Sequence, residues 1–152
     1  MITAWRICQA RHRSTAFDGR GAAEFPGRWN PAGVPVVYLA ESRSLASLEV
    51  LVHAEDLRLL TAVAWLAVPV SFPEALVHRP RRIPEAWRQP PAPAATREFG
   101  RAWVEAATSV VLRVPSVVTA GEFNYILNPR HPDFSRLKLG PPEPFAFDAR
   151  LA

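Results

Sequence analysis

The chain of 152 residues is long enough to bury the core of one domain and too short for two typical domains. Its 18 basic and 14 acidic side chains leave a net charge of +4, and hydrophobic residues make up 49% of the chain. This composition excludes disordered, collagen-like and coiled-coil proteins. The single cysteine excludes an internal disulfide framework and a multi-cysteine metal site. We expect residues 1–152 to form a single domain.

Hydrophobic periodicity and turn residues predict the elements of the first half of the chain. Residues 11–27 are polar and rich in glycine, which predicts a long loop. Ser42 is a favourable N-cap for the helix that follows it. The predicted elements are strands over residues 5–8, 36–40 and 61–70, and a helix over residues 43–55.

The second half begins with a proline-rich connector over residues 85–93. A second helix is predicted over residues 96–108, because Phe99, Trp103 and Ala107 share one helical face. Late strands with few helices favour an α+β fold over a doubly wound sheet. The remaining predicted strands span residues 110–114, 117–119, 134–139 and 145–147.

Several features favour a cytoplasmic protein that binds neither membranes nor nucleic acid directly. The N-terminus has no charged segment followed by an apolar run, so we expect no signal peptide. The longest nearly uncharged apolar stretch, residues 59–70, is too short to span a bilayer and contains Pro69. The basic residues are scattered, and their one tight cluster is Arg79, Arg81 and Arg82. A nucleic-acid footprint normally needs a continuous basic patch.

Residues 27–31, Gly-Arg-Trp-Asn-Pro, form the first candidate ligand site. A glycine beside an arginine lets a ligand approach the backbone, and the guanidinium of Arg28 can bind a phosphate or a carboxylate. Trp29 and Tyr38 could stack on a flat ring. The alternative is a turn in which Trp29 anchors the core and Arg28 is solvated, and residue types alone favour this alternative.

A carboxylate stands at the edge of an apolar helix face. At roughly 100° per residue, Glu49 lies about 40° from Leu45 and about 60° from Val52, with Leu48 placed further into that face. Burial of a carboxylate is costly unless it is paired. Glu49 therefore either has a structural partner or faces a cleft, and both interpretations are open.

The remaining candidates are weaker when taken singly. Ser116 interrupts an apolar run, but no Gly-x-Ser-x-Gly elbow supports a serine hydrolase. Asn and Pro residues in the segment 122–132 indicate ordered turns, in which His131 more often ties a loop than acts as a base. The four histidines lack paired metal-ligand spacing, so we expect no metal. No glycine-rich nucleotide-binding loop occurs.

In this order, these segments resemble the RES domain, the toxin half of RES–Xre toxin–antitoxin modules. The shared pattern is an early Arg, Gly-Arg-Trp-Asn, a strand ending in Tyr, an Ala-x-x-Glu helix, a Pro-Ser strand and an Asn-Pro-x-His-Pro loop. One departure is Phe25-Pro26, where the family often has a second glycine. The matching positions are Arg6, residues 27–30, 36–38, 45–49 and 114–116, and Asn124 with residues 128–132.

The resemblance implies a fold similar to ADP-ribosyltransferases, with a split, mostly antiparallel β core and flanking helices. It also implies an enzyme that takes NAD⁺ as its substrate, needs no other cofactor, and cleaves the nicotinamide–ribose bond by hydrolysis or phosphorolysis. The residues carried over as catalytic are Arg28, Tyr38, Glu49 and Ser116, and those carried over as substrate-binding are Arg6, Trp29 and Asn124.

Each of these residues has an expected role in that reaction. Arg28 binds the pyrophosphate, and Arg6 is a second candidate for phosphate or ribose. Tyr38 stacks on or orients the nicotinamide ring. Glu49 accepts a hydrogen bond from a ribose hydroxyl and stabilises positive charge at the anomeric carbon. Ser116 fixes the ribose or shapes the wall of the site, and we do not expect it to act as a covalent nucleophile.

The resemblance further implies an Xre-family antitoxin as the partner that blocks the site. Two other functions stay open. One is an ADP-ribosyltransferase that modifies a specific protein, and the other is a non-catalytic nucleotide- or RNA-binding module in which aromatic residues stack on bases. The sequence leaves open whether water, phosphate or a protein side chain is the acceptor, and whether the chain forms a homo-oligomer.

Overall fold

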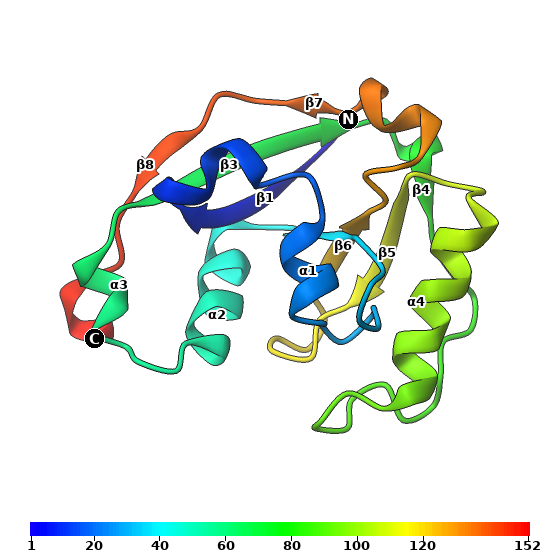
Figure 1. Ribbon diagram of the computed structural model, residues 1–152, viewed down its shortest axis with the longest axis horizontal. Coiled ribbons are helices and arrows are strands. Elements are labelled where there is room, and N and C mark those ends of the chain that lie inside the picture. The colour runs from blue at the N-terminus through cyan, green and yellow to red at the C-terminus, as the bar shows by residue number, and fades with distance from the viewer.

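The computed structural model describes residues 1–152, which form one curled sheet with helices packed against it (Figure 1). The 8-stranded sheet has the order β4-β5-β6-β2-β1-β3-β7, and β8 also pairs with β3. All neighbouring strands are antiparallel except β4 and β5. The strands are β1 (Ile2–Gln9), β2 (Val37–Ala40), β3 (Trp65–Phe72), β4 (Val77–His78), β5 (Val111–Pro115), β6 (Phe123–Leu127), β7 (Lys138–Leu139) and β8 (Glu143–Phe145).

Four α-helices and four short 3₁₀ helices join the strands. The Oγ of Ser42 accepts a hydrogen bond of 3.0 Å from the backbone N of Leu45, so Ser42 is the N-cap that the sequence predicts for α2. The helices are α1 (Arg20–Glu24), α2 (Arg43–His53), α3 (Leu59–Ala62), α4 (Ala94–Ala106), η1 (Ala10–Thr15), η2 (Glu74–Leu76), η3 (Pro132–Arg136) and η4 (Ala149–Leu151).

The sheet is split between β1 and β2. The register between these strands has one pair, Trp5 with Ala40, whereas β1 pairs with β3 along its whole length. Beyond that pair the two strands separate, and the side chain of Arg6 bridges the gap. Its Nη1 donates a hydrogen bond of 3.2 Å to the backbone oxygen of Tyr38. The split therefore places a cation between the two halves of the sheet.

Apolar side chains fill both faces of the sheet. One cluster, with Leu39, Phe72 and Tyr125, lies on the face opposite α4. A second cluster lies beneath α2 and includes Leu45. A third lies between the sheet and α4 and includes Trp29. The helices are thus held by burial of one apolar face each, the main source of helix stability in proteins.

The α+β fold with a split, mostly antiparallel β core and flanking helices is confirmed. Several element boundaries differ from the prediction. The predicted loop over residues 11–27 contains η1 and α1, and residues 117–119 form a bend instead of a strand. Residues 59–62 form α3, so the predicted strand 61–70 begins at Trp65. Of the predicted strand 134–139, residues 134–136 belong to η3 and residues 138–139 form β7, and the segment 122–132, assigned to turns, contains β6.

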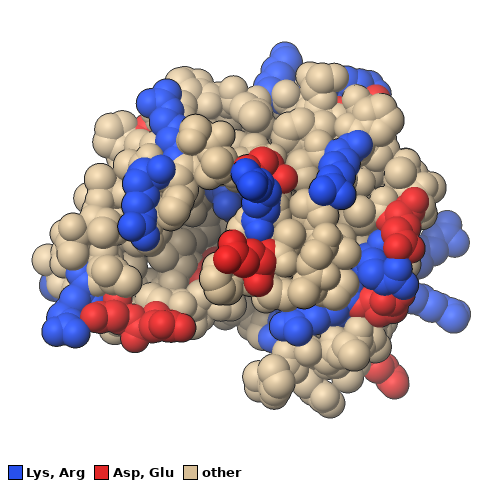
Figure 2. Space-filling view, viewed as in Figure 1, with Lys and Arg blue, Asp and Glu red and all other residues tan.

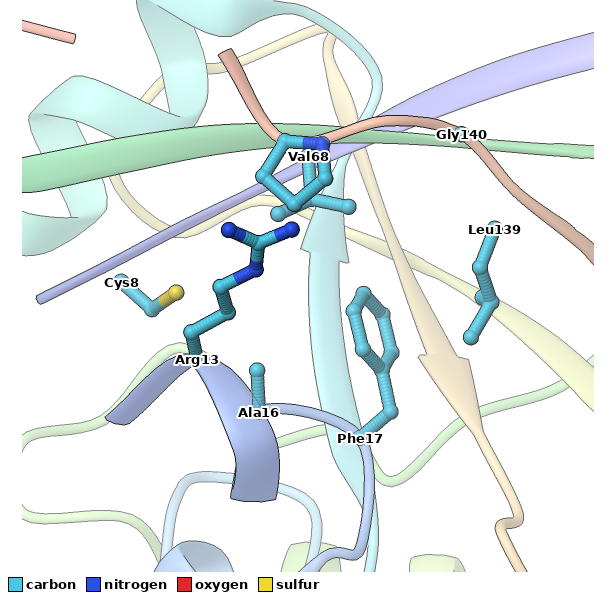
Figure 3. Close-up of a pocket in the computed structure, with 8 residues that line it drawn as sticks. Cys8, Arg13, Ala16, Phe17, Val68, Leu139 and Gly140 are labelled. Atoms are coloured by element: carbon cyan, nitrogen blue, oxygen red, sulfur yellow. The ribbon is translucent and has the colours of Figure 1, made fainter. Parts of the chain in front are cut away.

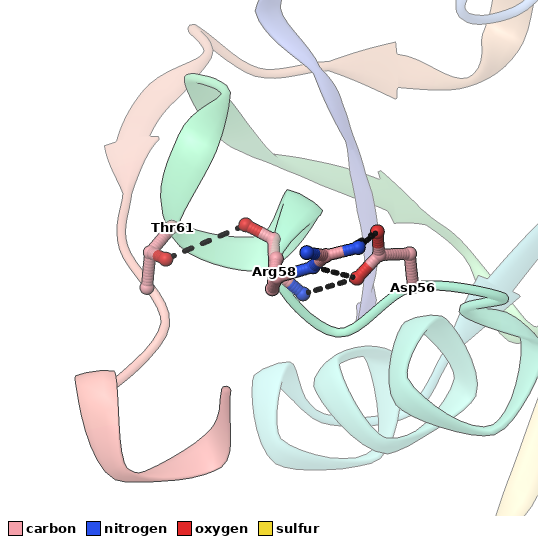
Figure 4. A network of polar contacts seen from close by, with 3 residues as sticks. All are labelled: Asp56, Arg58 and Thr61. Carbon is pink, nitrogen blue, oxygen red and sulfur yellow. Dashed lines mark hydrogen bonds and ion pairs between the residues drawn. The ribbon is translucent and has the colours of Figure 1, made fainter.

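The turn between α2 and α3 is held by local polar contacts (Figure 4). The guanidinium of Arg58 binds both carboxylate oxygens of Asp56, with Nη2 to Oδ2 at 2.9 Å. Thr61 then donates its hydroxyl to the backbone oxygen of Arg58. These contacts are exposed and contribute little to the free energy of unfolding. Their effect is to fix the local conformation of the turn. No helix in the structure has the length and apolar character that a membrane crossing requires.

Candidate active site

Residues from four separated segments meet on the face of the sheet that α2 and α4 cover. Strand pairing places Tyr38 beside Ile126, and Asn124 beside both Ala40 and Val114. Side chains of directly paired residues lie on the same face of a sheet. Ser116 follows β5 at the same end, and α2 brings Glu49 over it. Figure 2 shows this side of the molecule hollowed between the parts that Figure 1 labels α1 and α2.

The carboxylate of Glu49 is half-buried, with 28% of its side chain exposed. Burial raises the pKa of Glu49 above its ordinary value, and four neighbours oppose the rise. His53, one turn later on α2 with its Nε2 3.9 Å from Oε2, acts through its charge when protonated. The other neighbours are the side chains of Asn124 and Ser116, which approach as hydrogen-bond donors, and the cation of Arg28. Glu49 therefore has partners and also faces the hollow.

The hydroxyl of Ser116 is almost fully buried, with 1% of the residue exposed. Its Oγ accepts hydrogen bonds of 3.1 Å from the backbone N of Val118 and of Thr119. These bonds occupy the lone pairs of Oγ and direct its proton elsewhere, and Glu49 is the acceptor beside it. Ser116 is thus placed to hold the carboxylate of Glu49.

The phenol of Tyr38 is fixed by the Gly-Arg-Trp-Asn segment. Its oxygen donates to Oδ1 of Asn30 at 2.7 Å and accepts from the backbone N of Trp29 at 3.0 Å. A Cβ on Gly27 would lie 2.6 Å from the Tyr38 hydroxyl, so only glycine lets the ring occupy this position. Burial raises the pKa of Tyr38 well above its ordinary range, so the phenol stays neutral.

Arg28 is held by the proline-rich connector. Its Nη1 donates to the backbone oxygens of Trp87 and Gln89, at 2.6 and 2.8 Å. The connector itself is anchored because the ring of Trp87 stacks on Trp29, with centroids 6.3 Å apart. Nη2 and Nε of Arg28 make no hydrogen bond within the chain and stay free to donate. The guanidinium is therefore oriented in advance, and its charge reaches both Glu49 and Tyr38.

Arg6 lies at the split in the sheet, where its Nη1 donates to the backbone oxygen of Tyr38. Its Nε is buried with no hydrogen-bond partner, and its Nη2 makes no hydrogen bond. Burial lowers the pKa of Arg6, and Cys8 and Asp18 oppose this effect. A guanidinium stays charged in proteins, so Arg6 is a cation that lacks a carboxylate partner. An anionic group entering the split would supply the missing acceptor.

The structure places Trp29 in the core. Only 3% of the residue is exposed, and its ring packs against Trp87 and Phe99. Trp29 therefore cannot stack on a ligand. Of the two roles considered for it in the sequence, the structure agrees with that of a core anchor. Leu48 also differs from the prediction, because it is 40% exposed. The buried face of α2 is centred on Leu45 and Ala46, near the N-terminus of the helix, and Leu48 points away from it.

His131 ties its loop, as its sequence context suggests. Its Nε2 lies 2.9 Å from the backbone oxygen of Ala107, and its Nδ1 accepts from the backbone N of Asp133 at 3.0 Å. The C-terminus of α4 is thereby joined to the start of η3. No group of three or more His, Cys, Asp or Glu side chains is placed to hold a metal ion.

Two residues of α4 support the site from behind, and the sequence alone does not identify either of them. Gly100 on α4 touches the backbone of Trp29 so closely that a Cβ there would lie 1.5 Å from its oxygen. Arg97, one helical turn earlier, donates from Nε to the backbone oxygen of Gly27 at 3.2 Å. The face of α4 toward the Gly-Arg-Trp-Asn segment thus fixes the segment that positions Tyr38 and Arg28.

A separate pocket lies between η1 and the chain after β7 (Figure 3). Arg13 points into it from η1, toward Cys8 and Val68 on the sheet. The Cys8 thiol is buried, and burial raises its pKa, with the charge of Arg6 opposing the rise. None of the seven residues expected in the substrate site lines this pocket. Six of those seven residues instead gather at the split and the hollow beside it.

Comparison with known proteins identifies the family. The sequence matches the RES domain family over residues 3–148. The protein named Toxin Res from Yersinia enterocolitica is 39% identical over 148 residues, which are 97% of each chain. The protein named Prs ADP-ribosylating toxin from a Sphingobium species is 36% identical over 152 residues, covering 97% of this chain and 94% of that protein.

The fold is also found in a solved structure, the crystal structure of the M. tuberculosis MbcT–MbcA toxin–antitoxin complex. A chain of that complex superimposes with a TM-score of 0.75 at 19% identity, covering 95% of this chain and 84% of that chain. At this level of identity the likeness is one of fold. The sequence relatives span nearly the whole chain, and the chain therefore belongs to the RES domain family, among relatives that are named as toxins.

Proposed function

We propose that this chain is the toxin of a toxin–antitoxin pair and consumes NAD⁺ in the cytoplasm by cleaving its nicotinamide–ribose bond. The observation that carries the proposal is the half-buried Glu49, held on α2 with Ser116, Asn124 and Arg28 around it. The cleaved C–N bond passes through an oxocarbenium-like state, and a fixed carboxylate stabilises the positive charge that develops on the ribose.

The site supplies positioning and electrostatic support more than acid catalysis. Nicotinamide leaves as a neutral molecule from a cationic ring, so the leaving group needs little protonation. Glu49 accepts a hydrogen bond from a ribose hydroxyl, and Ser116 and Asn124 hold the carboxylate in place. Tyr38 orients the nicotinamide ring through its face, because its hydroxyl is bonded to Asn30 and to the backbone of Trp29.

The two arginines supply the positive charge for the pyrophosphate. Arg28 offers Nη2 and Nε, since its Nη1 is bonded to the connector. Arg6 offers Nη2 from the split in the sheet, where its buried Nε also has no hydrogen-bond partner. Guanidinium groups bind phosphates through two parallel hydrogen bonds, which matches a pyrophosphate placed between two such groups. Trp29 has no contact with substrate in this proposal.

In the hydrolytic reaction, water adds to the anomeric carbon, nicotinamide leaves with the electrons of the C–N bond, and one proton is released. The products are ADP-ribose and nicotinamide. In phosphorolysis, inorganic phosphate takes the place of water, and the sugar product carries a phosphate. NAD⁺ is the substrate in both reactions, and neither requires a further cofactor.

The partner in this proposal is an antitoxin of the Xre family that covers the hollow. Two observations support a protein partner: sequence relatives are named as toxins, and the related fold was solved within a toxin–antitoxin complex. An enzyme that drains NAD⁺ would arrest its host unless its site is blocked. Residues 1–152 act as one domain in this proposal, because the site is assembled from both halves of the sheet.

The test is NAD⁺ consumption by the purified protein, with and without phosphate, followed by mass analysis of the products. We expect loss of NAD⁺ and release of nicotinamide, with ADP-ribose or its phosphorylated form as the second product. The matched variant is Glu49→Gln, which keeps the shape of the side chain and removes the charge. A folded, antitoxin-free protein that leaves NAD⁺ intact in both buffers would refute NAD⁺ hydrolysis and phosphorolysis.

A second candidate is transfer of ADP-ribose to a protein. It is favoured by one observation, that a relative 36% identical to this chain is named an ADP-ribosylating toxin. Both reactions share the NAD⁺ site and differ only in the acceptor. Incubation with NAD⁺ labelled in its adenine ring and with a cell extract separates them, because transfer leaves the label on a protein band and hydrolysis leaves it on free ADP-ribose.

A further inference from the structure

A pocket rich in arginine lies on the opposite side of the sheet from the candidate active site. The cavity measures about 220 Å³. Successive side chains of a strand point to opposite faces of a sheet. Arg113 precedes Val114 on β5, and Phe123 precedes Asn124 on β6. The side chains of Arg113 and Phe123 therefore project from the face opposite the candidate active site. The lining residues are Arg79, Pro80, Arg81, Ile83, Arg113, Pro115 and Phe123.

Arg113 is the fixed part of this pocket. Its guanidinium lies over the ring of Phe123, 3.4 Å from the centroid, which sets the plane of the fork. The guanidinium forms neither an ion pair nor a hydrogen bond, and its Nε is buried without a partner. A planar cation with all its donors unused is suited to an oxyanion that accepts two parallel hydrogen bonds.

The other two arginines stand at the mouth of the pocket. Arg79 pairs with Glu74 at 3.2 Å, and 46% of the Arg79 side chain is exposed. Such a surface pair is worth little, so Arg79 can turn to a ligand at small cost. Arg81 is exposed and has no ion pair. Around Tyr125, on the same face of the sheet, Glu41 and Glu74 balance Arg113 and Arg79, and Arg81 is an additional cation of the pocket.

We propose that this pocket binds the phosphate group of a small molecule. The fixed guanidinium of Arg113 donates two hydrogen bonds to the phosphate, and the guanidinium groups of Arg79 and Arg81 contact the phosphate from the mouth of the pocket. The apolar walls of Ile83 and Pro115 suit the organic part of a phosphate ester. The site takes either free phosphate or an ester, since the recognising group is the same. This proposal is tested by binding alone and does not depend on NAD⁺ cleavage.

Titration calorimetry of the full chain tests the proposal with two probes, inorganic phosphate and phenyl phosphate. The variants are Arg113→Met, which keeps the aliphatic length and removes the fork, and Arg81→Gln at the exposed mouth. The matched control is Arg82→Gln, which removes the same charge from an exposed neighbour that does not line the pocket. Circular dichroism confirms that each variant is folded.

We expect saturable binding that weakens about tenfold or more in Arg113→Met, that weakens also in Arg81→Gln, and that stays unchanged in Arg82→Gln. Tighter binding of phenyl phosphate would identify an ester as the ligand, and equal affinity would identify free phosphate. The absence of saturable binding to the wild-type protein would overturn the proposal. Equal weakening in Arg82→Gln and Arg81→Gln would also overturn it, because binding would then follow the general charge of the surface.

Discussion

The hydroxyl of Tyr38 and the side-chain oxygen of Asn30 are joined by a hydrogen bond of 2.7 Å, and the same hydroxyl accepts from the backbone N of Trp29. Asn30 is fully buried and also accepts from the backbone N of Gly27 at 2.9 Å. The phenol is therefore part of the framework of the site. A group committed to two such bonds, and kept neutral by burial, has no proton-transfer role in the mechanism we propose.

Tyr38→Phe tests this framework role. The substitution leaves the buried N–H of Trp29 without an acceptor, so the free energy of unfolding should fall by about 1–3 kcal/mol. Urea unfolding measures the change. The control is Tyr125→Phe, since the other tyrosine is also buried but its hydroxyl makes no hydrogen bond within the chain. Folded Tyr38→Phe should keep its NAD⁺ turnover within a few-fold, and complete loss of turnover would show that the hydroxyl takes part in the chemistry.

Glu49→Gln should separate activity from stability. The neutral amide cannot stabilise a developing positive charge, so kcat should fall about 100-fold or more while NAD⁺ still binds. Initial rates and equilibrium binding of NAD⁺ measure the two effects. Glu55→Gln is the matched control, because it removes a carboxylate from an exposed position shortly after α2 and should leave kcat unchanged. Turnover by Glu49→Gln at the wild-type rate would remove Glu49 from the mechanism.

The raised pKa of Glu49 gives two effects of pH with opposite signs. In the mechanism we propose, the ionised carboxylate stabilises the developing cation, so kcat should rise with pH and reach half its maximum above the ordinary Glu range. Between the ordinary and the raised pKa the folded protein holds more protons than the unfolded chain, so stability falls as pH rises through this interval. At pH 7, Glu49→Gln should therefore unfold at a higher urea concentration than the wild type. A lower midpoint would show that the charge is stabilising.

The sequence predicts the parts of the site whose chemistry is local. Glu49 can be placed at the edge of a helix face because helical periodicity fixes the angle between side chains. The position of Ser116 beside Glu49 depends on strand pairing between distant segments, and periodicity carries no information about it. The indole ring of Trp29 is of a kind that often stacks on ligands, and the sequence does not show that it is buried. Its burial follows from contacts with Trp87 and Phe99, which only the fold brings together.

The same reasoning explains the errors in secondary structure. The strand β6 carries Asn124 and is followed directly by Asn128 and Pro129, a composition typical of turns, and its pairing with β2 and β5 overrides that local preference. Residues 117–119 have high β propensity but find no partner strand, because Ser116 binds their backbone N–H groups and turns the chain. The connector binds Arg28 through the backbone oxygens of Trp87 and Gln89. Contacts to backbone atoms do not depend on side-chain identity, so no sequence motif predicts them.

Trp87→Ala tests whether that connector orients Arg28. Loss of the stack on Trp29 should loosen the carbonyls that receive Nη1, so the KM for NAD⁺ should rise while kcat changes little. Steady-state kinetics over a range of NAD⁺ concentrations separate the two constants. Gln89→Ala is the control, because the backbone oxygen of residue 89 accepts from Arg28 whichever side chain is present. An unchanged KM in Trp87→Ala would show that Arg28 is oriented without the connector.

Gly100→Ala should be among the most damaging single substitutions in the chain, although it adds one methyl group to a helix. The new Cβ would lie 1.5 Å from the backbone oxygen of Trp29, so α4 must move away from the Gly-Arg-Trp-Asn segment. We expect the free energy of unfolding to fall by about 3 kcal/mol or more, in the range of severe overpacking. Gly21→Ala in α1 is the control, since no atom lies within 4 Å of its added Cβ and alanine favours a helix by about 0.5–1 kcal/mol. Urea unfolding of both variants measures the difference, and two equally stable proteins would show that α4 does not pack against Trp29 as described.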